Sequence, residues 1–167
     1  ASNAASVAPH GGTRAVFTPD PLAFGFPTEG DPVLIDLSAS LTTNGMTTRL
    51  HKRGERLAHP WLLTADGEAT NDPAVLFAEP PGTILPTGGV DAGHKGYALA
   101  LIVEMLTGAL AGFGRADPKE GWGATVAVHV IDPDAFGGRA SFERQADWLV
   151  EACRTNPPRP GVDAVRL

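Results

Sequence analysis

Residues Gly93–Met105 read GHKGYALALIVEM and contain the longest apolar run of the chain. The run predicts a helix over residues 95–110 that is apolar on nearly all sides and therefore buried. Gly112 and Gly114 follow it and are expected to end it. Because the run is short and Glu104 interrupts it, it is not expected to span a bilayer. We expect this segment to be the central helix of a folded domain.

The start of this helix is the most informative candidate site. The first N–H groups of a helix are unpaired and carry a partial positive charge, so they favour an anion. Gly93 and Gly96 would let a ligand approach the backbone closely, and Lys95 adds a cation. The physical pattern leaves two interpretations open, a phosphate or carboxylate site and a glycine-rich helix cap with a solvated lysine.

The rest of the chain alternates predicted strands and helices, which is typical of α/β or α+β proteins. The helix predicted over residues 41–53 is expected to be capped by Ser38 or Ser40 and to end at Gly54. The predicted strands are 15–17, 33–37 (buried), 124–131 and a strand-like end at 162–167; the predicted helices are 41–53 and 141–154; the predicted loops are 19–32 and 60–86.

Two further groups of polar residues are candidates for ligand contacts. Asp36 and Ser38 lie at the end of a predicted strand, where side chains of α/β sheets often face a ligand crevice. Asp36 is suited to a ribose hydroxyl, but it is equally suited to capping the next helix. Asn44 and Gly45 alone indicate a turn.

Composition limits the classes of function. The chain has 167 residues, 43% hydrophobic and 19% charged, as expected for one globular domain. The net charge of −6 disfavours nucleic-acid binding, which needs a basic surface. A single cysteine, Cys153, excludes an intrachain disulfide, and the five histidines lack a metal-hydrolase spacing. We expect a cytoplasmic protein with no metal and no membrane segment.

The common dinucleotide and hydrolase motifs are missing from the sequence. No Gly-x-Gly-x-x-Gly segment follows a strand and opens a helix, and neither a P-loop nor a Gly-x-Ser-x-Gly motif occurs. If the chain binds a dinucleotide, it must therefore use an architecture other than the Rossmann fold.

Several segments in a fixed order resemble the malate/L-lactate dehydrogenase family, which also includes ureidoglycolate dehydrogenase, sulfolactate dehydrogenase, diketogulonate reductase and cyclic-imine carboxylate reductase. The segments cover nearly the whole chain, and their ordered set is specific although each alone is weak. They are VAPHGG (7–12), PLAFGFP (21–27), LIDLSAS (34–40), DGEATNDP (66–73), ILP (84–86), GHKGYALAL (93–101) and EMLTG (104–108).

The resemblance implies a mixed-sheet α/β NAD(P)-binding domain of the sulfolactate dehydrogenase-like type, distinct from the Rossmann fold, in a homodimer. It implies reversible hydride transfer between NAD or NADP and a 2-oxo or 2-hydroxy acid such as malate, lactate or ureidoglycolate. Some relatives reduce a cyclic imine with NADPH instead. The implied cofactor contacts are Ser2, Asp36, Leu37, Ser38, His94, Lys95 and Gly96, and the implied substrate contacts are Thr18, Asn44, Gly45 and His94.

The chain departs from the family pattern at three places. Phe17-Thr18-Pro19-Asp20-Pro21 stands where relatives often have Gly-Thr-Asn-Pro, and Met46 stands where some relatives have an assisting carboxylate. The family's catalytic histidine belongs to a segment before residue 1, and a Pro-Gly-Glu cofactor loop is expected after Leu167. We therefore expect residues 1–167 to be a single nucleotide-binding domain, a fragment that is inactive alone and holds no catalytic residue.

Two other functions remain open from the sequence. The chain is also compatible with a non-catalytic module that binds a nucleotide or another anion at Gly93–Gly96. It is compatible, too, with a structural domain whose glycine loops are only helix caps. Binding of NADH in preference to ATP would distinguish the dehydrogenase from the anion-binding module, and ligand binding unchanged by Lys95→Ala would indicate the structural domain.

Overall fold

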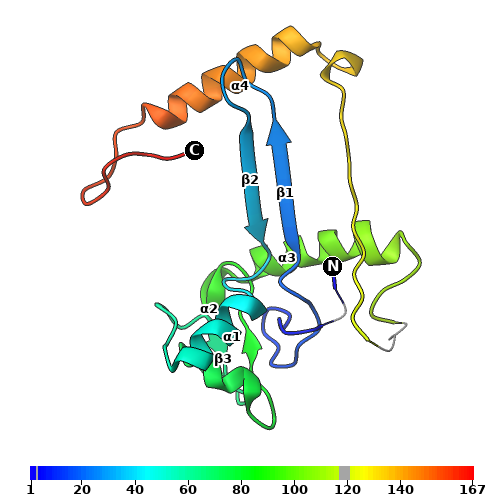
Figure 1. Ribbon diagram of the computed structural model, residues 1–167, viewed down its shortest axis with the longest axis vertical. Helices are drawn as coiled ribbons and strands as arrows, with labels where there is room; N and C mark the ends of the chain where they lie inside the picture. The colour runs from blue at the N-terminus through cyan, green and yellow to red at the C-terminus, as the bar shows by residue number, and fades with distance from the viewer. Residues whose placement is uncertain (3, 117–120) are drawn as a thin grey trace. The chain divides into compact units, whose positions relative to one another are not determined.

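The computed structural model describes residues 1–2, 4–116 and 121–167 (Figure 1). The chain forms two compact units. Unit 1 comprises residues 1–22 and 37–127, and unit 2 comprises residues 23–36 and 128–167. Whether they act as the single domain expected from the sequence stays a prediction.

A small antiparallel sheet lies in the core of unit 1. Its central strand is β3 (Leu62–Leu63), which pairs with β4 (Ala69–Thr70) on one side and β5 (Thr83–Ile84) on the other. Val7 extends it through a parallel bridge to Ile84. The prediction of a loop over 60–86 was wrong here, because strands of two residues are too short to show alternation. The buried core residues are Val7, Phe17, Ala39, Leu57, Leu62, Ile84 and Ala100.

Helix α1 (Asn44–Arg53) ends as expected but is capped by a different residue. The Thr43 hydroxyl accepts a hydrogen bond from the Met46 N–H group at 3.2 Å. Ser38 and Ser40 were wrong as caps, because their hydroxyls donate to backbone carbonyl groups two residues further on, both at 2.7 Å. Gly54 ends the helix with a φ of 68°, in the left-handed region that glycine adopts without strain.

The central helix is present, and it is preceded by a short turn of helix. Helix α2 (Gly89–Ala92) leads through Gly93 into α3 (His94–Glu104), and a π-helical turn, η2 (Met105–Ala109), continues it. Ala100 and Val103 are buried, but Ile102 is 52% and Met105 is 55% exposed. The prediction of burial on nearly all sides was wrong, because described residues cover only one face.

Strands β1 (Pro21–Phe26) and β2 (Val33–Ser38) form a two-stranded sheet and run antiparallel in Figure 1. The sequence predicted a loop over residues 19–32, but proline is compatible with the first residue of a strand. The predicted buried strand at 33–37 exists but is mostly exposed. Val33 is buried, whereas Leu34 is 79% exposed.

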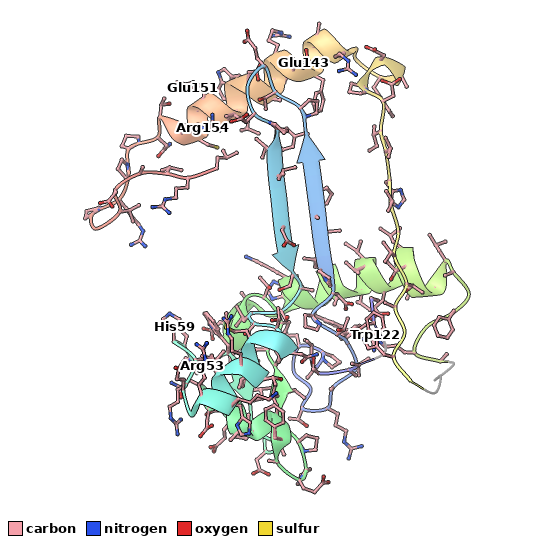
Figure 2. The ribbon with its side chains drawn as sticks, in the orientation of Figure 1. Arg53, His59, Trp122, Glu143, Glu151 and Arg154 are labelled. Atoms are coloured by element: carbon pink, nitrogen blue, oxygen red, sulfur yellow. The ribbon has the colours of Figure 1, made fainter. Side chains whose placement is uncertain are left out.

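Unit 2 contains the long helix α4 (Arg139–Arg154), which confirms the predicted amphipathic helix and starts two residues earlier. Ala146 and Val150 are its buried residues. The Asp147 carboxylate accepts a hydrogen bond from the Glu29 N–H group at 2.8 Å, which fastens the β1–β2 turn to the helix. Figure 2 shows Glu143, Glu151 and Arg154 along α4.

The predicted strand over 124–131 was wrong in the described part of the chain. This segment is extended but forms only an isolated bridge, between Ser2 and Ala124. Val126, Val128 and Val130 are all more than 80% exposed. Residues 162–167 likewise form no strand. The predicted strand at 15–17 is reduced to an isolated bridge between Phe17 and Val7, and the Val16 N–H group also donates to the Val7 carbonyl oxygen at 2.9 Å. The short turns η1 (Pro73–Phe77) and η3 (Pro133–Ala135) complete the elements.

Over the described residues, none of the helices combines the length and the apolar character that crossing a bilayer would need.

Candidate functional site at the start of helix α3

The two glycines at the start of α3 serve backbone packing. A Cβ atom on Gly96 would lie 2.3 Å from the Thr87 nitrogen and 2.4 Å from the Ala39 carbonyl oxygen. A Cβ atom on Gly93 would lie 2.3 Å from the Gly89 carbonyl oxygen. The space beside these glycines, which was predicted to admit a ligand, is therefore filled by the protein's own backbone.

The helix start also offers fewer free N–H groups than the sequence predicted. The Gly96 N–H group donates to the Thr87 carbonyl oxygen at 3.0 Å, and the Tyr97 N–H group donates to the Gly93 carbonyl oxygen at 2.9 Å. The expectation of unpaired N–H groups was wrong at these two residues, because α2 and the Thr87 turn precede α3 directly. Attraction of an anion must then depend largely on side chains.

Two histidines meet at this point. The rings of His10 and His94 are 5.9 Å apart, edge to face, with an interplanar angle of 70°. Gly93 makes this possible, because a Cβ atom there would lie 2.8 Å from His10 Nδ1. His10, His94 and Lys95 are all exposed. We call these three residues the histidine–lysine cluster; two imidazoles and an ammonium group are well suited to bind phosphate or carboxylate oxygens.

His10 had not been selected from the sequence, where it lies far from His94. Its only signal was the turn His10-Gly11-Gly12, which does not reveal a partner. The fold brings it to α3 because Val7 pairs with Ile84 and carries the following residues along the core.

The end of β2 is tied to the entrance of α3. The Thr87 hydroxyl donates to the Ser38 carbonyl oxygen at 3.0 Å, and the Thr87 N–H group donates to the Ala39 carbonyl oxygen at 2.8 Å. Ser38 is therefore hydrogen-bonded to Thr87, the residue that contacts Gly96. Leu37 is exposed in unit 1, and Asp36 is exposed in unit 2.

Ser2 and Thr18 lie together near the N-terminus. Their hydroxyl oxygens are 3.1 Å apart and share a hydrogen bond. Thr18 is only 4% exposed, so a substrate would reach it only after movement of the covering chain. Its predicted substrate contact is therefore not accessible in this conformation.

Asn44 and Gly45 line a shallow hollow along α1. Thr48, Arg49, Lys52 and Arg53 line the rest of it. Figure 2 shows Arg53 on this helix. The hollow is thus basic, a property that the turn-like Asn-Gly pair did not reveal.

A buried carboxyl group, which the sequence gave no reason to select, lies at Asp20. It is fully buried, and neither of its oxygens has a hydrogen-bond partner among the described residues. Its φ of 46° is the one positive value found at a described residue other than glycine. Burial is the main reason why the pKa of Asp20 rises from 3.8 to about 7; Glu104 also raises it, and Arg115 and the α-amino group of Ala1 lower it.

The described residues contain no group of three or more histidine, cysteine or acidic side chains placed to hold a metal ion.

Comparison with known proteins identifies the family of the chain. The family model described as malate/L-lactate dehydrogenase matches residues 1–167. The L-lactate dehydrogenase of Cupriavidus necator is 32% identical over 166 residues, which are 96% of this chain and 46% of that protein. The L-sulfolactate dehydrogenase of Methanothermobacter thermautotrophicus is 31% identical over 158 residues, which are 90% of this chain and 44% of that protein.

Solved structures share the fold. The sulfolactate dehydrogenase of Methanocaldococcus jannaschii superposes with a TM-score of 0.75 at 25% identity, covering 98% of this chain and 47% of that one. The malate dehydrogenase of Entamoeba histolytica gives a TM-score of 0.80 at 23% identity, covering 98% and 50%. The helix and sheet arrangement is therefore that of sulfolactate dehydrogenase-like proteins, as predicted.

The chain belongs to the malate/L-lactate dehydrogenase family. It spans about half the length of the curated relatives it matches.

Proposed function

We propose that the intact protein binds NAD or NADP with the start of α3 and transfers hydride between the cofactor and a 2-oxo or 2-hydroxy acid. The observation that carries this proposal is the histidine–lysine cluster: His10 and His94 pack edge to face at the start of α3, Lys95 follows His94 in the sequence, and all three residues are exposed. Family membership adds support, because relatives include dehydrogenases of lactate, malate and sulfolactate.

The residues present fit a dinucleotide. Three groups capable of carrying positive charge face solvent in a chain whose net charge is −6, so anion binding must be local. Ser38 and Asp36 follow along β2, and the Ser38 oxygen retains acceptor capacity for a ribose hydroxyl. When bound, the nicotinamide group supplies the hydride, and the residues of this chain hold and orient it.

We assign the phosphates to Lys95 and His94. A backbone contact of the cofactor with Gly96 would require the Gly96 N–H group to leave the Thr87 carbonyl oxygen. Ser2, Asp36, Leu37 and Ser38 are further proposed cofactor contacts. Asn44, Gly45 and His94 are proposed at the substrate, and Thr18 would join them once the chain that covers it moves. A substrate carboxylate would be attracted by the basic hollow of α1. Proton transfer is assigned to a histidine outside residues 1–167, as the family resemblance implies.

The choice of cofactor and substrate is also a proposal. A relative from Chromohalobacter salexigens, 42% identical over 113 residues, is named an NADP(+)-dependent (2R)-3-sulfolactate dehydrogenase. Another, from Ancylobacter novellus, is a Delta(1)-pyrroline-2-carboxylate reductase and is 35% identical over 153 residues. Cyclic-imine reduction is therefore the second candidate reaction. We propose a cytoplasmic homodimer that binds neither nucleic acid nor membranes.

Fluorescence titration of the intact protein with NADH, NADPH and ATP tests the binding site. We expect a reduced nicotinamide cofactor to bind and ATP to bind more weakly. Lys95→Ala should weaken cofactor binding about tenfold, the loss of one charge-assisted contact. Arg154→Ala, an exposed cation on α4 outside the proposed site, is the control and should leave cofactor affinity unchanged.

A substrate panel tests the reaction. Oxidation of NADH or NADPH should be followed with pyruvate, oxaloacetate, 3-sulfopyruvate and a cyclic imine carboxylate. Turnover of any of the three 2-oxo acids supports the main proposal, and turnover of the imine alone supports the second. Equal affinity for ATP and NADH without turnover would indicate an anion-binding module instead.

A further inference from the structure

The basic hollow along α1 carries more positive charge than a single substrate carboxylate requires. Arg49, Lys52 and Arg53 line it, and all three residues are exposed. They stand at positions i, i+3 and i+4 of one helix and therefore share a face. Positive charge is thus concentrated on one helix face of a chain whose net charge is −6.

The cations of the hollow are not neutralised within the part of the chain that the structure describes. The ion pairs found there join other residues, namely Arg56 with Asp72, Arg115 with Glu104, and Arg139 with Glu143. Arg49 Nη2 lies 2.9 Å from Met46 Sδ, but a thioether sulfur is only a weak acceptor and carries no charge. The positive charge of the hollow therefore remains available to a ligand.

The position of these cations along α1 differs from ordinary stabilisation of a helix end. Lys52 and Arg53 lie in the last turn, where the helix dipole favours cations, but Arg49 lies before that turn. At the other end of the hollow, a Cβ atom on Gly45 would meet nothing within 4 Å. This face of α1 is therefore open to a ligand, unlike the start of α3, where backbone atoms fill the space beside the glycines.

A phosphate monoester matches the charge of the hollow better than a carboxylate does. At neutral pH it carries nearly two negative charges on three oxygens, whereas a carboxylate carries one. Guanidinium groups bind phosphate oxygens through two parallel hydrogen bonds, and an ammonium group such as that of Lys52 adds a point charge. Asn44 and Thr48, which also line the hollow, have an amide and a hydroxyl as further donors. A phosphate monoester is therefore favoured over the substrate carboxylate considered above.

The hollow follows closely in the chain on a residue of the proposed cofactor site. Ser38, a proposed ribose contact, accepts a hydrogen bond from Thr87 at the entrance of α3. Asn44, which begins α1, follows six positions later. Between them, the Leu41 N–H group donates to the Leu85 carbonyl oxygen at 3.0 Å, which fastens the connecting turn to the core. A ribose held at Ser38 would therefore lie near the start of α1.

We propose that Arg49, Lys52 and Arg53 hold the 2′-phosphate of NADP, and that the intact protein therefore prefers NADP to NAD. The two cofactors differ only in this phosphate on the adenosine ribose, so a site for it decides between them. The inference rests on the proposed function for the identity of the ligand, whereas the presence of a phosphate site in the hollow does not. The three cations bind the cofactor far from its reacting atoms, so they set its affinity and not the chemical step.

Fluorescence titrations with NADPH and NADH test the preference in the intact protein. We expect NADPH to bind about tenfold more tightly or better, because NADH leaves the three cations without a ligand. Arg49→Gln should weaken NADPH binding about fivefold and change NADH binding less than about twofold. Arg53→Gln should act in the same direction. Arg154→Gln is the matched control, since Arg154 is also the exposed last residue of a helix, and it should change neither affinity.

Adenosine 2′,5′-bisphosphate and adenosine 5′-phosphate test the phosphate site without the nicotinamide. Calorimetry should show the bisphosphate binding about tenfold more tightly to the native protein, and Arg49→Gln should remove most of this difference. The substituted side chains are exposed, so urea unfolding should be the same for native protein and variants. A loss of binding then reports on the site and not on folding.

The outcomes separate this inference from the proposed function. Equal affinity for NADPH and NADH, or equal losses of both in Arg49→Gln, overturns the 2′-phosphate assignment while the dehydrogenase proposal stands. A raised KM for a 2-oxo acid with unchanged NADPH affinity also overturns it and places the substrate carboxylate in the hollow. If neither reduced cofactor binds, the proposed function fails, and the comparison of the bisphosphate with adenosine 5′-phosphate still decides whether the hollow is a phosphate site.

Discussion

At the scale of single residues, this protein uses glycine for close packing where a ligand loop was expected. Gly96 stands where α3 meets the Ala39 and Thr87 backbones, and its N–H group already donates to Thr87. The glycines of the pattern Gly-His-Lys-Gly therefore have a packing role that the sequence did not suggest, and the ligand site at this helix start stays a prediction. The side chains between the glycines, together with His10, remain available to a ligand.

Substitution of Gly96 tests this packing role. Gly96→Ala places a methyl group within 2.4 Å of two backbone atoms, and neither can move without breaking the Thr87 contacts. We expect a loss of about 3 kcal/mol or more in the free energy of unfolding, measured with urea.

Gly45→Ala is the matched control for that substitution. Gly45 lies in the first turn of α1, and a Cβ atom there meets nothing within 4 Å. Unfolding should become harder by about 0.5–1 kcal/mol, because alanine favours helix. Equal effects of the two substitutions would contradict the packing role of Gly96.

At the scale of elements, local signals predicted helices well and long-range pairs poorly. Helix α4 follows from the spacing of Phe142, Ala146 and Val150, and the end of α1 follows from Gly54. These signals lie within one or two turns of chain. The cap of α1 was missed because several hydroxyl residues precede it, and only the backbone conformation selects Thr43.

The candidate site shows the same limit. His94 and Lys95 were found because they start a recognisable helix. His10, Asp20 and Arg115 were not, because each acquires its role from a partner distant in the sequence. The exposure of the valines in 124–131 could not be predicted either, because alternating valines predict a paired strand and only the tertiary structure shows that they are exposed.

Removal of the α1 cap gives a prediction at this scale. Thr43→Ala deletes the acceptor for the Met46 N–H group, so stability should fall by about 1 kcal/mol, as read from denaturant unfolding. Thr43→Ser keeps the hydroxyl and should cost less than half as much. A serine variant as unstable as the alanine variant would show that the threonine methyl group, and not the cap, is what matters.

At the scale of the whole molecule, two features lie outside the proposed site: exposed apolar side chains on α3 and η2, and the buried carboxyl group of Asp20. On α3, on η2 and directly after η2, the residues Ile102, Met105 and Leu110 are each more than half exposed. The chain spans about half the length of its relatives, and the dimer we propose would also bury surface of this kind. Stability measurements therefore belong on the intact protein.

The pH dependence of global stability follows from Asp20 with a definite sign. Its pKa is about 7 in the folded state and 3.8 as an ordinary carboxyl group. Between these values the folded state holds a proton that the unfolded state has released, so the free energy of unfolding falls as pH rises from about 4 to about 7 and then levels off. Three pKa units correspond to at most about 4 kcal/mol, and solvent relaxation will reduce this.

Other carboxylates titrate in the same range, so the informative quantity is the difference between native protein and Asp20→Asn. Asparagine does not ionise, and its advantage over aspartate should grow from near zero at pH 4 to about 2–4 kcal/mol at pH 7 and remain constant to pH 9, in urea unfolding at each pH. Asp66→Asn, an exposed change in the same unit, should show no such growth. A difference that is flat with pH would mean that Asp20 is ionised in the folded protein. In that case a cation must accompany Asp20, since burial without either a proton or a counter-charge is too costly for a stable fold.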